Sequence, residues 1–102
     1  METFGEYIKR LRTSRDLTIT KISEEIGIDS TLWSRIERDE RRPSKDVISK
    51  IAITFNQNEK DLLQKYYSDN FAYKIIVENI DVKVLRVAER KVKYLKMKGT
   101  RL

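Results

Sequence analysis

The chain has 102 residues, of which 37% are charged, and it carries a formal net charge of +6. It contains neither cysteine nor histidine, which excludes disulfides and thiolate metal sites and removes the commonest general base and zinc ligand. We therefore expect no catalysis, no bound metal and no cofactor.

The excess of positive charge lies at the C-terminal end. Residues 1–80 contain 14 basic and 14 acidic residues, whereas residues 81–102 contain eight basic and two acidic ones. A basic end points to nucleic acid, less often to an acidic partner or an anionic membrane, and is also compatible with an ordinary solvated helix face. No apolar run approaches the ~20 residues needed to span a bilayer, and the N-terminus has no signal-peptide pattern. We expect a cytoplasmic protein that has no membrane association.

The first predicted helix begins at the N-terminus. Thr3 followed by Glu6 is a capping-box pair, and apolar residues then recur at helical spacing as far as about Ser14.

Two short helices are predicted next, joined by about three residues. Thr18 is a suitable cap for the first, which ends at Gly27 because glycine readily adopts the left-handed conformation that follows a helix. Asp29 is a suitable cap for the second, which buries Trp33 and runs to about Arg38.

Two further helices complete an all-α domain. Ser44 can cap a fourth helix, and Asn58 together with Asp61 can cap a fifth. Five helices with short connections predict a helical domain over residues 1–66. The remainder, residues 67–102, is expected to be a helical extension.

Residues 68–79 have patterns of both a strand and a helix. Alternating apolar residues favour a strand, whereas the spacing of Tyr66, Tyr73 and Val77 favours a helix. A lone strand would leave its backbone unpaired unless a dimer supplied a second one, which favours a helix.

Residues 81–98 are predicted to form an amphipathic helix. Its basic face contains Lys83, Arg86, Arg90 and Lys93, and the opposite apolar seam contains Leu85, Ala88, Val92 and Leu95.

The stretch from Leu17 to Pro43 carries the most functional information. It reads Leu17-Thr-Ile-Thr-Lys-Ile-Ser-Glu-Glu-Ile-Gly-Ile and then Trp33-Ser-Arg-Ile-Glu-Arg-Asp-Glu-Arg-Arg-Pro-Ser. With its flanks, over residues 4–66, this pattern resembles the XRE family of lambda-repressor-like helix-turn-helix regulators. The resemblance implies a five-helix lambda-repressor-like domain that binds double-stranded DNA, with the second helix of the motif in the major groove.

The resemblance also implies roles for individual residues. Those that match base-reading positions are Ser30, Thr31 and Arg35, with Ser34 as a nearby candidate. Those that match positions near phosphates are Thr18, Arg38, Arg41 and Arg42. The alternative is that the hydroxyls only support a helix start and that the arginines are ordinary surface charges. Arg12 and Glu37 match a pair that joins the first helix to the third.

The chain departs from the family pattern at two positions. Ile19 stands where a glutamine that anchors a phosphate is common, and Asp39 stands where glycine is common. The first departure puts that anchor in doubt. The second predicts a different turn after the recognition helix.

We therefore expect a sequence-specific transcriptional regulator that acts as a homodimer on a palindromic or repeated operator. A controller of a restriction–modification operon or a phage-type repressor would fit. Dimerisation is expected through Leu85, Ala88, Val92 and Leu95, because a small core cannot cover this seam. The alternative is an antitoxin-like protein that binds a protein partner through its extension and uses the helix-turn-helix for autoregulation.

Overall fold

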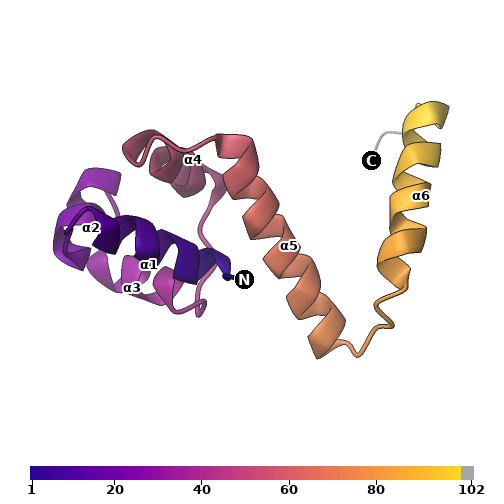
Figure 1. The fold of residues 1–102 in the computed structure, drawn as a ribbon, viewed down its shortest axis with the longest axis horizontal. Coiled ribbons are helices and arrows are strands. Elements are labelled where there is room, and N and C mark those ends of the chain that lie inside the picture. Colours follow the sequence, from indigo (N-terminus) through magenta and orange to yellow (C-terminus); the bar gives the residue numbers. More distant parts are fainter. Residues whose placement is uncertain (100–102) are drawn as a thin grey trace. The chain divides into compact units, whose positions relative to one another are not determined.

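A computed structural model describes residues 1–99. Within this range every regular element is a helix, and the prediction of an all-α fold is confirmed (Figure 1). The helices are α1 (Phe4–Ser14), α2 (Ile19–Ile26), α3 (Ser30–Glu37), α4 (Lys45–Thr54), α5 (Glu59–Val77) and α6 (Val84–Lys98). Most of the ambiguous segment 68–79 is therefore helix, because it continues α5. None of the helices in the described range is long and apolar enough to cross a bilayer.

The helix starts follow the capping chemistry written in the sequence. Thr3 and Glu6 form the complete capping box, with the Glu6 N–H donating to the Thr3 hydroxyl at 3.1 Å and the Thr3 N–H donating to the Glu6 carboxylate at 2.9 Å. A single side chain caps each of the next four helices. These residues are Thr18, Asp29, Ser44 and Asn58.

The helix ends use left-handed residues, and most of these are not glycine. Gly27 and Gly99 end α2 and α6, whereas Asp16, Asp39, Asn56 and Asn79 follow the other four helices with φ of 55°, 59°, 52° and 52°. Aspartate and asparagine tolerate this conformation better than other residues that have a Cβ. The expectation of a different turn at Asp39 is wrong, because this aspartate adopts the backbone conformation that glycine favours.

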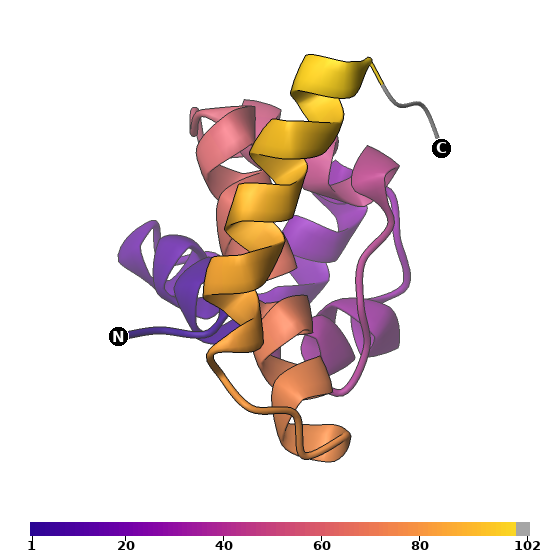
Figure 2. The same ribbon diagram turned by 90° about the vertical axis from the view of Figure 1, so that its right-hand side faces the viewer.

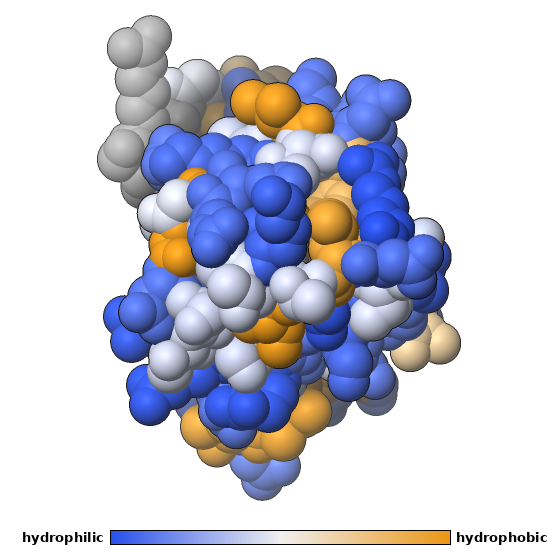
Figure 3. All heavy atoms as spheres, turned by 90° about the vertical axis from the view of Figure 1, so that its left-hand side faces the viewer, coloured by the Kyte–Doolittle hydropathy of each residue, from blue (hydrophilic) through white to orange (hydrophobic). Residues whose placement is uncertain are grey.

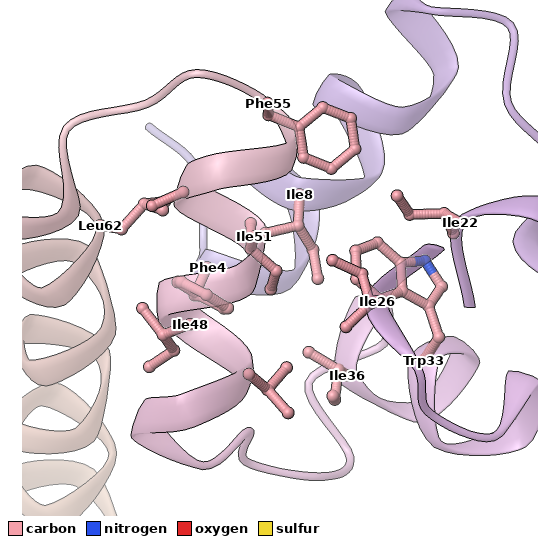
Figure 4. Packing of buried hydrophobic residues seen from close by; sticks show 12 residues of the cluster. Phe4, Ile8, Ile22, Ile26, Trp33, Ile36, Ile48, Ile51, Phe55 and Leu62 are labelled. Atoms are coloured by element: carbon pink, nitrogen blue, oxygen red, sulfur yellow. The ribbon is translucent and has the colours of Figure 1, made fainter. Parts of the chain in front are cut away.

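One hydrophobic core is formed by α1 to α4 and the beginning of α5. Its buried residues are Phe4, Ile8, Ile22, Ile26, Trp33, Ile36, Val47, Ile48, Ile51, Ala52, Phe55 and Leu62. Figure 4 shows the Trp33 indole from α3 packed with Ile22 and Ile26 of α2. Burial of each large side chain contributes about 1.5–3 kcal/mol, so this core is what orients α2 and α3.

The chain divides into two units, residues 1–69 and residues from 70 onward. The second unit contains the end of α5, a connection of residues 78–83 and α6 (Figure 2). Helix α6 begins three residues later than the expected start at Asp81. The cause is local, since the Asp81 carboxylate accepts from the Lys83 N–H at 2.9 Å and residues 81–83 form a turn. Every residue of α6 is exposed.

Candidate nucleic-acid interface

Helices α2 and α3 are joined by residues 27–29. Gly27 has φ of 83°, and the N–H groups of Gly27 and Ile28 both donate to the Ser23 carbonyl, at 2.8 and 3.0 Å. Asp29 then caps α3 by accepting from the Thr31 N–H at 2.7 Å. This backbone hydrogen bond lowers the pKa of the Asp29 carboxyl. Two helices that contact each other and are joined by so short a turn form a helix-turn-helix unit.

Helix α3 has one buried side and one exposed side. Trp33, Ile36 and Glu37 are buried, whereas Ser30, Thr31 and Arg35 are exposed. Ser34 is half-buried, and its hydroxyl accepts from the Arg38 guanidinium at 3.0 Å. The structure therefore brings together three of the four predicted base-reading side chains on the open side of the helix and engages the fourth with a neighbour.

The buried carboxylate of Glu37 connects α3 to α1. It accepts two hydrogen bonds from the Arg12 guanidinium, at 2.6 and 3.1 Å, and one from the Trp33 indole N–H at 2.5 Å. Arg12 also donates, at 2.8 Å, to the carbonyl of Leu17, the residue that precedes the N-cap of α2. One ion pair therefore links α1, α3 and the start of α2, at the two positions where the family resemblance implies a pair.

The acidic residues near the end of α3 are all engaged within the protein. Glu37 pairs with Arg12, the Asp39 carboxylate accepts from the Gly5 N–H at 3.0 Å, and Glu40 pairs with Arg38 at 3.1 Å. In contrast, three neighbouring arginines are exposed, and they have no ion pair within residues 1–99. These are Arg35, Arg41 and Arg42. Positive charge is therefore left toward solvent on α3 and in the loop that follows it, although residues 1–69 are neutral in total.

The start of α2 contributes the Thr18 hydroxyl but has no glutamine at the next position. Thr18 is exposed, and its Oγ1 accepts from the Lys21 N–H at 3.0 Å, so its own O–H can still donate to an external oxygen. Ile19 is half-buried and packs against the core. It therefore takes a packing role at the position where the family pattern has an anchoring glutamine.

The first unit presents a largely polar face on the side of α2. In Figure 3, which views that side, hydrophilic side chains predominate and apolar ones form only small separate areas. A nucleic-acid interface has this character, because most protein–DNA hydrogen bonds are made to phosphate and sugar by polar and basic groups. Within residues 1–99 no group of acidic side chains could hold a metal ion.

Two carboxylates bind the start of α1 through contacts that the sequence did not indicate. Asp39 bonds to the backbone of Gly5, and Asp69 accepts from the Phe4 N–H at 2.6 Å. They lie 34 and 65 residues from their partners. No local spacing rule connects residues so far apart, and no signal in a single sequence could have found these contacts.

The seam predicted for dimerisation lies on α6 and is open to solvent. Leu85, Val92 and Leu95 are 44%, 50% and 36% exposed, and Ala88 is also exposed. Further large apolar side chains of α6 are exposed as well. These are Val84, Val87, Tyr94 and Met97. Within the described residues this is the helix on which exposed apolar side chains are most concentrated.

Comparison with known proteins identifies the family of the first unit. A family model described as a helix-turn-helix domain matches residues 5–68. A solved structure of the SinR protein, determined in a SinR protein/SinI protein complex, is similar with a TM-score of 0.56. The two chains are 19% identical over 93% of this chain and 99% of that one, so the likeness concerns the fold. No curated protein matches the sequence.

Proposed function

Because the chain belongs to the helix-turn-helix domain family, we propose that it is a sequence-specific DNA-binding regulator of transcription that places α3 in the major groove. The family match and the SinR-like fold confirm the resemblance to XRE regulators. The observation that carries the proposal is the exposed side of α3, with its hydroxyls and Arg35, followed by a loop in which Arg41 and Arg42 have no acidic partner among residues 1–99. The protein is a binding module rather than an enzyme and works in the cytoplasm, where bacterial or phage DNA lies.

Residues on α3 read bases in this proposal. Ser30 and Thr31 lie in the first turn, which enters a groove most deeply, and Arg35 follows one turn later on the same side. A guanidinium suits the two acceptors of guanine, whereas hydroxyls are less selective. Ser34 assists from the edge of this surface, because its O–H remains able to donate while its oxygen accepts from Arg38.

Residues around the exposed side of α3 contact DNA phosphates in this proposal. Thr18 at the N-terminus of α2 donates through its hydroxyl, and the positive end of the helix dipole favours an anion there. Arg41 and Arg42 extend from the loop after α3, and Arg38 exchanges Glu40 for a phosphate oxygen. The exchange costs little, because Arg38 and Glu40 are 57% and 54% exposed and a solvated pair of this kind is weak.

We propose that residues 1–66 bind DNA and that residues 67–102 hold two copies together. The exposed seam of Leu85, Ala88, Val92 and Leu95 supports this, because a second α6 would cover it. A two-fold dimer presents two copies of α3 and requires a palindromic or repeated operator with half-sites about 34 Å apart. A restriction–modification controller or a phage-type repressor would have this organisation.

Selection of bound sites from random duplex DNA tests the proposal. The expected outcome is an enriched site with two related half-sites, protected in footprinting over about two helical turns. Recovery of duplexes without common sequence would refute sequence-specific recognition. A single half-site with a short footprint would retain DNA reading but refute the dimer.

An antitoxin-like interaction protein is the second candidate. It is favoured by the same exposed side of α6, which another protein could cover, and by the SinR chain having been solved in complex with the SinI protein. In that case DNA binding would serve autoregulation. The neighbouring gene distinguishes the two: a methyltransferase and a nuclease favour the controller, whereas a toxin favours the antitoxin.

A further inference from the structure

The first turn of α1 is anchored by side chains from three separate parts of the chain. The N–H of Phe4 donates to the Asp69 carboxylate at 2.6 Å, and the N–H of Gly5 donates to the Asp39 carboxylate at 3.0 Å. The following N–H donates to the Thr3 hydroxyl at 3.1 Å. A single local side chain is the usual cap, and the two additional carboxylates suit the positive end of the helix dipole. Only one of these two aspartates, Asp39, belongs to the end of α3.

Asp39 forms the turn that follows α3 and also binds the start of α1. Its φ of 59° allows the chain to leave α3, and its carboxylate also accepts from the Thr3 hydroxyl at 2.6 Å. The two helices approach closely at this point. A Cβ on Gly5 would lie 2.5 Å from the Glu37 carbonyl oxygen and 2.6 Å from that of Ile36. The last turn of α3 therefore lies directly against the first turn of α1.

Two anchors separated along α1 hold the end of α3. Arg12 binds Glu37, and Gly5 binds Asp39. The two α1 residues are seven positions apart, which is about 10.5 Å along a helix axis. The core orients α3 as a whole, and two polar contacts two turns apart along α1 restrict its remaining rotation more than a single contact would.

We propose that Asp39 is a positioning residue for DNA recognition: its carboxylate fixes the angle of α3 and the start of the loop that carries Arg41 and Arg42. This role rests on the proposed function. A glycine at this position would supply the turn alone. The carboxylate adds the second anchor, so that base-reading side chains meet the groove without first having to be ordered.

The Asp39→Gly variant of the full chain separates the two functions of this residue, because glycine keeps the left-handed turn and removes only the carboxylate. Asp69→Ala is the matched control, since it removes the other distant cap of α1 without touching α3. Affinities are measured on the selected operator and on a scrambled duplex, well below the melting temperature of each variant. Partial unfolding lowers both affinities by the same factor and leaves their ratio unchanged, whereas a misdirected α3 lowers the ratio.

We expect Asp39→Gly to reduce the operator-to-scrambled ratio about tenfold, the size of one lost base contact, and Asp69→Ala to leave it within about twofold. Asp39→Asn, which keeps an acceptor oxygen and tolerates the left-handed conformation, should restore most of the ratio. A wild-type ratio in Asp39→Gly, or an equal reduction in Asp69→Ala, would overturn the positioning role. A wild-type chain that prefers no duplex would reject the proposed function itself, which is a different result.

Discussion

The guanidinium of Arg12 on α1 holds the carboxylate of Glu37 at the end of α3 through two hydrogen bonds, with side chains only 11% and 5% exposed. The Trp33 indole completes the set by donating to the same carboxylate. Removal of one partner would leave a buried charge without its counterion, which is far more costly than the loss of a surface pair.

We therefore expect Arg12→Ala to lower the free energy of unfolding by about 3–5 kcal/mol, measured by urea denaturation. Arg10→Ala is the control, because the pair of Arg10 with Glu2 is solvent-exposed and its loss should change stability little. Equal effects of the two substitutions would show that burial of the Arg12–Glu37 pair does not increase its contribution to the free energy of unfolding.

Gly5 should not tolerate a side chain. In Gly5→Ala the new Cβ would meet carbonyl oxygens of α3 at 2.5 and 2.6 Å, and backbone atoms cannot move away cheaply. The expected destabilisation is about 1–3 kcal/mol, as for overpacking, seen as a lower melting temperature. Gly27→Ala provides a contrast, because open space surrounds Gly27 and only its φ of 83° disfavours alanine. A Gly5→Ala protein as stable as the wild type would rule out the close approach of α1 and α3.

Acid should weaken the caps of α1 and α3. The Thr3 backbone N–H lowers the pKa of Glu6 from its ordinary value of 4.5, and the Thr31 N–H lowers the pKa of Asp29 from 3.8. Because the folded pKa values lie below the unfolded ones, both carboxylates stabilise the fold above their ordinary pKa and lose this effect as pH falls through the lowered values.

The double variant Glu6→Gln with Asp29→Asn tests this directly. Both new side chains retain an oxygen that can cap but do not titrate at these positions. Thermal melts between pH 7 and pH 2 should therefore show a smaller loss of stability on the acid side than in the wild type. An unchanged acid dependence would assign the loss to other carboxylates.

Arg35 and Arg42 should affect DNA binding differently. Arg35 is exposed on α3, one turn after Thr31, whereas Arg42 lies in the loop beyond the helix. We expect Arg35→Ala to relax preference at one base pair by about 1–3 kcal/mol and Arg42→Ala to weaken all duplexes alike while reducing the slope of log affinity against log salt. Titrations on operator and scrambled DNA at several salt concentrations check both. Equal losses on both sequences for Arg35→Ala would place it on phosphate.

The dimer prediction can be tested with matched double substitutions, one in the apolar seam of α6 and one on its basic side. Leu85→Gln with Val92→Gln makes the apolar seam polar, whereas Arg86→Gln with Lys93→Gln introduces the same side chain on the basic side. Glutamine is a good helix former, so α6 itself should persist. Sedimentation at equal concentration should give a monomer for the seam variant and a dimer for the control. A dimeric seam variant would place the interface elsewhere.

Sequence alone determined the features that depend on neighbouring residues. The helix starts were predictable because Thr3, Thr18 and Asp29 cap their own first turns, and the buried side of α3 was predictable because Trp33 and Ile36 share one side of a helix. The spacing of apolar residues in 68–79 fits both a strand and a helix, so it did not decide between the two.

Tertiary structure decided what depends on residues distant in the chain. Asp39 keeps the turn expected of glycine while bonding to Gly5, 34 residues earlier, and Asp69 reaches Phe4 across 65 residues. These contacts arise only when packing of the core brings α1, α3 and α5 together, because a carboxylate has no preference for one distant amide over another until folding places it within hydrogen-bonding distance.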